Sequence, residues 1–288
     1  MSLQALKNNR KSNLKVLTEK LEETQEKRSF EDDRFWKPIR DKSGNGYAVI
    51  RFLPQVEGES VPWARLFSHG FQGTGGWYIE NSLTTLNQPD PVSEYNTSLW
   101  NNGTEAGKDQ ARKQKRRLNY ISNIYVVKDT ANPDNEGKVF LYKYGKKIFD
   151  KINEAMNPEF EDESAINPFD FWEGADFSLK IRTIDGFVNY DKSEFGTPSA
   201  FLEGDDDKLE ELYATEKPLT EFTDQSNFKT YDELKAKMER CLGLVVDDDT
   251  SFNSNEFTEP KEPISVTTEE TEGGEDTLQY FQKLANEQ

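Results

Sequence analysis

The fold is decided by the stretch QARKQKRRLNYISNIYVVKDTANPDNEGKVFLYKYGKKIFDK (110–151). The runs 118–128 and 138–147 within it are rich in β-branched and aromatic residues, and this composition predicts two strands. The connection 129–137 carries the Asp, Asn, Pro and Gly residues that favour turns. Residues 148–156 follow as a predicted short helix. We therefore expect a pair of strands leading into a helix.

The same stretch is basic in an otherwise acidic chain. Between Lys108 and Lys147 there are eleven Lys/Arg against four Asp/Glu, so the segment is net +7 in a chain of net −18. Aromatic residues are interleaved with these charges: Tyr120, Tyr125, Phe140, Tyr142, Tyr144 and Phe149. Cations neutralise phosphates, and flat rings stack on unpaired bases. The pattern indicates a single-strand-binding surface; the alternative is a solvated basic face over ordinary strand-core aromatics.

More strands are predicted on both sides of this stretch. They cover 43–54, 63–71, 75–80 and two runs within 171–195 that meet near Asp185 and Gly186. GTGG (73–76) is interpreted as a hairpin turn, whereas residues 81–119 lack periodicity and predict a long irregular insertion. About five or six short, mostly antiparallel strands with short helices predict a mainly β (α+β) fold. A Greek-key barrel such as an OB-fold suits that count.

Residues 207–243 have a helical pattern. Leu209, Leu212 and Tyr213 form one apolar stripe. A second stripe runs through 231–242, and Gly243 is its expected C-cap.

The N-terminal residues 1–28 read as a basic arm entering a helix. Lys7, Arg10, Lys11 and Lys15 precede any acidic residue, and leucines at 14, 17 and 21 recur at helical spacing. This apolar stripe is too narrow for an independent domain, so we expect the arm to dock elsewhere. A frayed, solvated terminus is the alternative.

The C-terminal end is strongly acidic. Residues 201–288 carry 24 Asp/Glu and eight Lys/Arg, a net −16, which leaves −2 for residues 1–200. Residues 247–276 are rich in Asp, Glu, Thr and Ser, and this composition predicts disorder. TLQYFQKLANE (277–287) then forms a short amphipathic peptide, typical of a partner-binding hook, or a fraying terminus. Because the acid is concentrated here, the low pI does not exclude nucleic-acid binding.

Other features bound the function. The single cysteine, Cys241, excludes disulfides within the chain, and no apolar run approaches the roughly 20 residues of a membrane span. The N-terminus lacks the apolar region of a secretory signal, so we expect a soluble, cytoplasmic protein. Aspartates 205–207 and 247–249 resemble nuclease metal ligands, but solvated charge runs are far commoner. With one histidine and no phosphate-binding loop, the sequence does not support an enzyme.

Several stretches resemble the single-stranded DNA-binding proteins of T-even-type bacteriophages, the gene 32 protein family. They are GNGYAVIRFLP (44–54), SHGF with GWYIE (68–80), 123–153, FWEGADFSLKI (171–181) and GFVNYDKSEF (186–195). The resemblance spans about 40–195 in one order. It implies an OB-fold core at 29–243, an inserted subdomain at 68–118, an N-terminal arm at 1–28 and an acidic tail at 244–288.

The resemblance also implies functional residues. A basic, aromatic-lined cleft for single strands would contain Lys113, Lys115, Arg116, Arg117, Tyr120, Tyr142, Tyr144, Lys146, Lys147, Phe187 and Tyr190. The motif Arg10, Lys11, Ser12 and Asn13 would mediate cooperative self-association along DNA, although Asn13 stands where a hydroxyl is expected. The tail would recruit replication and recombination proteins: a polymerase, a primase-helicase or its loader, and a recombination mediator.

The metal site departs from the family. The family's zinc is bound by one His and three Cys, whereas this sequence has His69, Ser82, Asp90 and Ser93 at those positions. Serine is a poor zinc ligand, so we expect no zinc and no other cofactor. The subdomain would then be held by apolar contacts of Phe71, Trp77, Tyr95 and Trp100.

The sequence thus predicts a non-catalytic, cooperative protein that coats single-stranded DNA in the cytoplasm of an infected bacterium, during phage replication, recombination and repair. Two alternatives stay open. One is an RNA-binding OB protein, since DNA and RNA are distinguished by contacts at the 2′ position. The other is an acidic interaction or chaperone-like protein that binds no nucleic acid.

Overall fold

The computed structural model describes residues 32–160 and 162–244. It divides into two units, one ending at Phe35 and the other beginning at Trp36. The predicted N-terminal arm, the disordered acidic segment and the C-terminal amphipathic peptide lie outside the described residues. Within the described part, no helix is long and apolar enough to cross a membrane.

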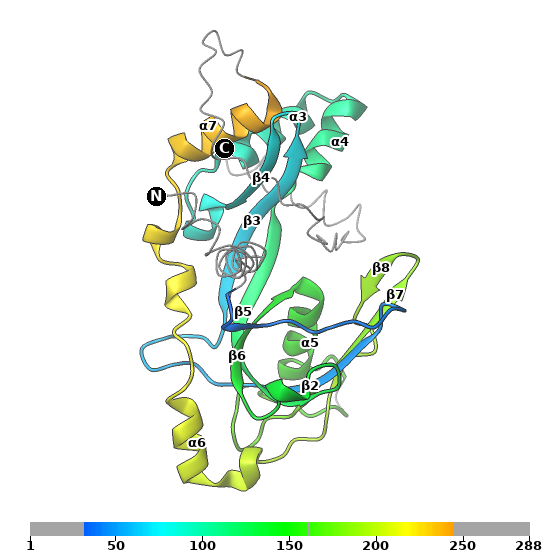
Figure 1. The fold of residues 1–288 in the computed structure, drawn as a ribbon, viewed down its shortest axis with the longest axis vertical. Helices are drawn as coiled ribbons and strands as arrows, with labels where there is room; N and C mark the ends of the chain where they lie inside the picture. The colour runs from blue at the N-terminus through cyan, green and yellow to red at the C-terminus, as the bar shows by residue number, and fades with distance from the viewer. Residues whose placement is uncertain (1–31, 161, 245–288) are drawn as a thin grey trace, which may run out of the picture. The chain divides into compact units, whose positions relative to one another are not determined.

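The fold is mainly sheet with short helices (Figure 1). The strands are β1 (Phe35–Trp36), β2 (Gly46–Phe52), β3 (Ala64–Gly73), β4 (Gly76–Asn81), β5 (Arg117–Asp129), β6 (Val139–Gly145), β7 (Phe177–Ile184), β8 (Phe187–Asn189) and β9 (Glu194–Phe195). The helices are α3 (Pro91–Asn101), α4 (Glu105–Lys113), α5 (Lys146–Met156), α6 (Asp206–Tyr213) and α7 (Tyr231–Leu242). The main sheet has the order β1-β6-β5-β2-β7-β8, with β3 paired to β5 and β4, and β9 paired to β7.

The long strand β5 organises the molecule, as the opening stretch predicts. It pairs antiparallel with β2, β3 and β6, and α5 follows β6 directly. The main core cluster lies on β2, β5, β6, α5 and β7, with apolar side chains such as Ile50, Phe52, Ile124, Ile152 and Phe177. Buried residues alternate with half-buried ones along most of β7, as is typical of a strand with one face on the core. The strand, turn and α5 predictions are confirmed, although the described strands number nine, more than expected.

A second core cluster joins the β3–β4 hairpin to α3 and α7. The prediction that 81–119 is irregular is wrong, because α3 and α4 occupy much of it. Asp90 and Thr104 cap these helices by accepting hydrogen bonds from the backbone amides of Ser93 and Gly107. Helical periodicity is weak in α3 because its buried face is largely polar and includes Asn96.

Two aromatic contacts predicted for this cluster differ from those observed. Phe71 is buried and Tyr95 packs against the cluster, as expected. The prediction for Trp77 is wrong, since 46% of its surface is exposed. Trp100 instead lies under the Arg112 guanidinium, 5.5 Å from the ring centroid. In place of Trp77 and Trp100, Leu234 and Met238 of α7 and their neighbours supply apolar contacts in this cluster.

The GTGG turn lies close to the end of α7, and this contact requires glycine. The backbone amide of Gly75 donates to the Cys241 carbonyl at 2.8 Å. A Cβ on Gly73 would lie 2.2 Å from that same oxygen, and one on Gly75 would lie 2.1 Å from the Arg240 carbonyl oxygen. The predicted C-cap Gly243 is confirmed, with φ 67°.

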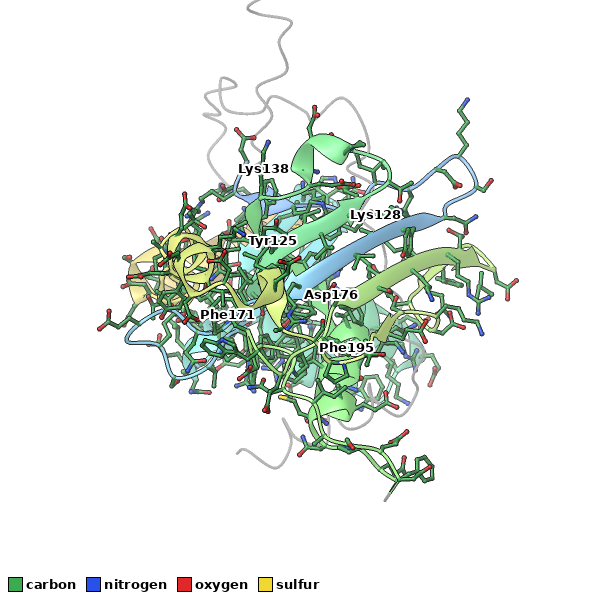
Figure 2. All side chains as sticks on the ribbon, turned by 90° about the horizontal axis from the view of Figure 1, so that it is seen from below. Tyr125, Lys128, Lys138, Phe171, Asp176 and Phe195 are labelled. Carbon is green, nitrogen blue, oxygen red and sulfur yellow. The ribbon has the colours of Figure 1, made fainter. Side chains whose placement is uncertain are left out.

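The third cluster ties α6 to the far end of β2. It contains Leu53, Phe171, Phe201, Leu209 and Leu212, with Tyr125 packed against it. Figure 2 labels Tyr125 of β5 and Phe171 of the loop before β7. Both rings contact Phe201, with centroids 5.0 and 6.2 Å away respectively. Residues distant in sequence therefore fix the 167–176 loop against the sheet.

A buried carboxyl lies in the link between α6 and α7. The Asn123 side chain clamps this link, donating to the Lys217 carbonyl at 2.8 Å and accepting from its amide at 2.9 Å. Neighbouring Glu216 is 8% exposed, and neither of its oxygens has a hydrogen-bond partner among the described residues. Burial, together with the nearby charge of Glu59, raises the pKa of Glu216 to about 8.

We expect Glu216→Gln to stabilise the protein at pH 8 by about 2 kcal/mol, or roughly 5 °C in Tm. The unfolded glutamate titrates near 4.5 and the folded one near 8, so wild-type stability falls as pH rises through this window. Glutamine cannot ionise and avoids the loss. Thermal melts at pH 4 and pH 8 check this: a gain at pH 8 that disappears at pH 4 is expected, and an equal gain at both values would contradict ionisation as the cause.

Candidate nucleic-acid interface

The predicted basic run lies at the corner between α4 and β5. Lys108 and Arg112 form ion pairs within α4, to Glu105 and Asp109. The corner is fixed by Gln114, whose carbonyl oxygen lies 2.9 Å from Nδ1 of His69 and accepts from the Asn96 amide at 3.1 Å. Lys113 is exposed, and the following cations Lys115, Arg116 and Arg117 are half-buried at the start of β5.

Two guanidinium groups lie over one aromatic ring beside this corner. Arg116 is 4.3 Å and Arg65 is 5.5 Å from the centroid of half-buried Phe67. Strand register explains the meeting, because Phe67 pairs with Leu118 and Arg65 with Tyr120. Each guanidinium group is attracted to the π electrons of the ring, so Phe67 holds two positive charges beside the basic segment. This arrangement suits a base beside its phosphate.

Sequence reasoning missed Arg65 and Phe67. The signal was present in the alternation of β3, where Ala64 and Leu66 are buried and Arg65 is exposed. A basic residue on the exposed face of a strand that pairs with the basic segment would have indicated this site.

Three predicted stacking residues lie in the main core. Tyr120, Tyr142 and Tyr144 are 7%, 3% and 3% exposed. Tyr120 stacks on Phe149 with centroids 3.8 Å apart, and the Tyr144 hydroxyl lies 2.9 Å from the Ser122 hydroxyl oxygen. Burial raises the pKa of Tyr120 and Tyr144, as expected for phenols removed from water. These three rings pack in the core under the candidate interface. Their direct stacking on bases stays a prediction.

A further group of cations lies on the opposite face of the β5–β6 pair. Lys143 is exposed, pairs with Ile121 across the strands and lies near Lys37 and Arg117. Partial desolvation lowers the pKa of Lys143, and the positive charges of Lys37 and Arg117 lower it further. Like charges held together repel each other, and a bound phosphate would relieve that repulsion.

The remaining predicted residues lie on α5 and β8. Lys146 pairs with Asp150 at 2.9 Å, and Lys147 is half-buried. Phe187 is 45% exposed, whereas Tyr190 is half-buried against the main core. Of the aromatic residues predicted to contact DNA, Phe187 therefore presents the most open ring. The predicted cooperativity residues, Arg10 to Asn13, lie outside the described residues.

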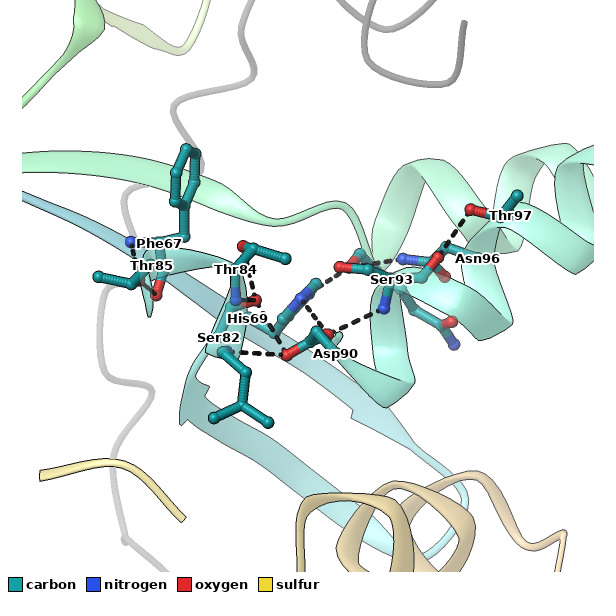
Figure 3. A network of polar contacts seen from close by, with 11 residues as sticks. Phe67, His69, Ser82, Thr84, Thr85, Asp90, Ser93, Asn96 and Thr97 are labelled. Atoms are coloured by element: carbon teal, nitrogen blue, oxygen red, sulfur yellow. Dashed lines mark hydrogen bonds and ion pairs between the residues drawn. The ribbon is translucent and has the colours of Figure 1, made fainter. Parts of the chain in front are cut away.

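The four residues at the family's zinc positions come together (Figure 3). Asp90 is their centre: Oδ1 lies 3.2 Å from His69 Nε2 and accepts from the Ser93 amide at 2.9 Å, while Oδ2 accepts from the Ser82 hydroxyl at 2.9 Å. The backbone amide of Leu83 also donates to Oδ2, at 3.1 Å. Nδ1 of the imidazole faces the Gln114 carbonyl oxygen, and Nε2 faces Asp90 Oδ1.

These residues do not fit a structural zinc. Two of the four are serines, and both Asp90 oxygens already accept hydrogen bonds from the protein. Among the described residues, no three His, Cys, Asp or Glu side chains gather as metal ligands. Cys241 lies in the second core cluster, where its thiol donates to the Gly76 carbonyl. A buried polar network therefore occupies this place.

We expect Asp90→Asn to destabilise the protein by about 3 kcal/mol at pH 7, because the amide replaces one carboxylate oxygen with a donor and breaks part of the buried network. Burial would raise the pKa of Asp90, but the hydrogen bonds and charge of His69, with the Ser93 and Ser82 donors, lower it to about 2. The stability that ionised Asp90 contributes is therefore present above about pH 4 and is lost as pH falls towards 2. Thermal melts at pH 7 and pH 3 measure it.

The matched control is Ser93→Ala, because the Ser93 hydroxyl has no partner among the described residues. We expect this variant to differ from wild type by less than about 1 kcal/mol. A zinc chelator should leave both melting temperatures unchanged. A chelator-sensitive wild-type melt would contradict the network interpretation.

Comparison with known proteins decides the family. A family profile described as "gp32 DNA binding protein like" matches residues 44–242. The chain belongs to this family. It is 39% identical over 251 residues to the single-stranded DNA-binding protein of Enterobacteria phage T2, covering 80% of this chain and 82% of the relative. It is 42% identical over 224 residues to the protein of that name from Enterobacteria phage T4, covering 76% and 73%. The gp32-like match includes the α4–β5 corner, Phe67 with its two arginines, and β8.

Proposed function

We propose that this protein binds single-stranded DNA without sequence preference and coats it during phage replication, recombination and repair. The observation that supports this best is Phe67 under the guanidinium groups of Arg65 and Arg116, beside the start of β5. Membership of the gp32-like family agrees with it. The protein acts as a binder and needs no catalytic group.

The mechanism combines charge and stacking. Arg116, Lys115 and Lys113 follow the phosphates, and release of counterions makes affinity fall steeply with salt. Phe187 offers an exposed ring, and the guanidinium groups over Phe67 offer flat cationic surfaces. Each stacked base contributes about 1–3 kcal/mol. The buried tyrosines beneath this surface limit its movement, so little ordering is needed on binding.

The proposed roles of the barrel, the N-terminal arm and the C-terminal tail rest on the resemblance to the gp32-like family and on the charge of each segment. The core is an OB-type barrel with an inserted subdomain stabilised by the Asp90 network in place of zinc. Residues 1–28 mediate self-association along DNA through Arg10, Lys11, Ser12 and Asn13. The acidic tail 244–288 binds replication and recombination proteins. The protein acts in the cytoplasm of the infected host cell.

Fluorescence titration tests the proposal. Tryptophan and tyrosine emission is followed while oligo-dT, oligo-rU or a matched duplex is added, at several salt concentrations. We expect quenching by the single DNA strand, weakened by salt, and little response to duplex. Equal or tighter binding of oligo-rU would favour the RNA-binding alternative. No response to any strand would favour the acidic interaction protein.

A further inference from the structure

Two glutamates lie together where the loop before β3 (53–63) contacts the link between α6 and α7 (214–230; Figure 1). One carboxyl oxygen of Glu59, from the loop, accepts hydrogen bonds from the backbone amides of Leu219 and Thr220. Glu216 shortly precedes these residues in the link, and the charge of Glu59 acts on its carboxyl group. The two carboxyl groups are therefore held at the same turn.

Three oxygens of these carboxyl groups have no hydrogen-bond partner among the described residues. Two of them belong to Glu216, which is 8% exposed, and the third is the second carboxyl oxygen of Glu59. A buried carboxyl oxygen loses its hydration, and proteins normally compensate with donors or with a cation. In the part of the chain that the structure describes, neither is supplied to these three oxygens.

The surroundings of the pair are negatively charged. The charge that acts on Glu216 is another carboxylate, Glu59. Burial raises the pKa of the nearby Tyr213 phenol, and the charges of Glu216, Glu57 and Glu59 raise it further. The Tyr213 hydroxyl donates to the Gln55 carbonyl oxygen at 3.0 Å. A narrow, acidic site of this kind attracts a small cation from solution.

Both walls of the site are fixed by hydrogen bonds. On the link, the Asn123 side chain holds both the amide and the carbonyl of Lys217. On the loop, the Glu59 amide donates to the Val56 carbonyl at 3.0 Å, in a turn where Gly58 has φ 89°. Oxygen ligands that are held in place before binding lower the entropic cost of binding an ion.

The available ligands suit a hard divalent cation. Carboxylate oxygens favour Mg²⁺ and Ca²⁺, whereas softer transition metals prefer sulfur and imidazole. Mg²⁺ keeps several water ligands and is commonly bound through one or two carboxylates. Two carboxylates are therefore enough, although no three His, Cys, Asp or Glu side chains gather as metal ligands in the described ranges.

We propose that Glu59 and Glu216 bind a hard divalent cation, with Mg²⁺ as the best fit and water completing its coordination. The ion connects the loop before β3 to the link between α6 and α7. This inference goes beyond the proposed function, and its test needs no DNA. The Glu216→Gln gain predicted above belongs to the ion-free protein.

Thermal melts of the full-length protein at pH 8 test the site. Mg²⁺, Ca²⁺ or K⁺ is added at matched ionic strength to a buffer freed of divalent ions. We expect a divalent ion at about ten times its Kd to raise the wild-type Tm by about 4 °C more than K⁺ does. Glu216→Gln and Glu59→Gln should each lose this increment.

The matched control is Glu211→Gln, which makes the same charge change at an exposed residue of α6 and should keep the increment. Equal increments in wild type and in the two site variants would show that divalent ions act on the acidic surface, and would overturn the site. Equal stabilisation by K⁺ would overturn it as well. A zinc-selective chelator removes neither Mg²⁺ nor Ca²⁺, so the test of the Asp90 network is independent.

Amide hydrogen exchange then locates the ion. The Leu219 and Thr220 amides donate to Glu59, so an ion bound to Glu59 should slow their exchange by about tenfold in wild type and leave it unchanged in Glu216→Gln. The Gly75 amide, which donates to the Cys241 carbonyl beside the second core cluster, is the internal control and should exchange at the same rate with and without the ion. Equal slowing at Gly75, or none at Leu219 and Thr220, would overturn the proposal.

Discussion

Replacing Arg65 and Arg116 together with alanine is expected to weaken binding to a short oligo-dT by about 10- to 100-fold at low salt. Both guanidinium groups lie over Phe67, so the variant loses two positive charges and the flat groups proposed to contact the bases. Counterion release predicts that the slope of log affinity against log salt becomes shallower by about 0.7 for each phosphate that the variant no longer neutralises. Fluorescence titrations at four or five salt concentrations measure both quantities.

A matched control removes two cations from another surface. Lys229 and Lys237 both pair with Glu80, and neither lies in the candidate interface. Their double alanine variant should keep most of the affinity and the salt slope. Phe67→Leu then separates stacking from charge, since it should weaken binding while leaving the slope unchanged. If the arginine pair and the lysine pair lose affinity equally, long-range charge alone determines binding and the Phe67 site is not the interface.

The elements predicted well are those with local signals. Alternation and turn chemistry gave β5, β6 and their connection, and the Asp185-Gly186 turn lies between β7 and β8 as expected. Gly243 ends α7 because only a left-handed residue fits there without strain. In each case a few neighbouring residues decide the conformation, so their sequence is sufficient.

The features missed depend on residues far apart in the chain. The α3 helix buries Asn96 and Thr97 in a polar network, and this polar face conceals the helical pattern. The packing of α7 on the β3–β4 hairpin depends on the close approach of Gly73 to Cys241, which no local pattern indicates.

Local sequence patterns also do not predict to which face of the sheet the binding residues point. Tyr142 and Tyr144 lie two residues apart and so point to the same face of β6, but the sequence does not say which face the core covers. The structure places both in the core and leaves Arg65 exposed on β3. The residue types were therefore enough to predict nucleic-acid binding. Which side chains lie on the binding surface could be seen only in the structure.

Removing residues 247–288 is expected to tighten single-strand binding, by about tenfold at low salt and by little at high salt. This segment contains twelve Asp/Glu and two Lys, a net charge of −10, on a chain that also carries a net +7 stretch. A tethered polyanion competes with DNA for cations at a high effective concentration, and salt screens that competition. The truncated protein should also melt duplex DNA more effectively, because tighter single-strand binding shifts the equilibrium.

The target of the tail can be identified by making the truncation in two backgrounds. If the tail competes at Phe67 and its arginines, truncation should tighten one-site binding in the full-length chain and in a chain lacking residues 1–20. If it competes for the basic arm, the gain should require the arm and appear only on long strands. A tail with its acids replaced by Ser and Gly at constant length separates charge from chain volume. Unchanged low-salt affinity after truncation would contradict competition by the tail, and its acidity would then serve only the recruitment of partner proteins.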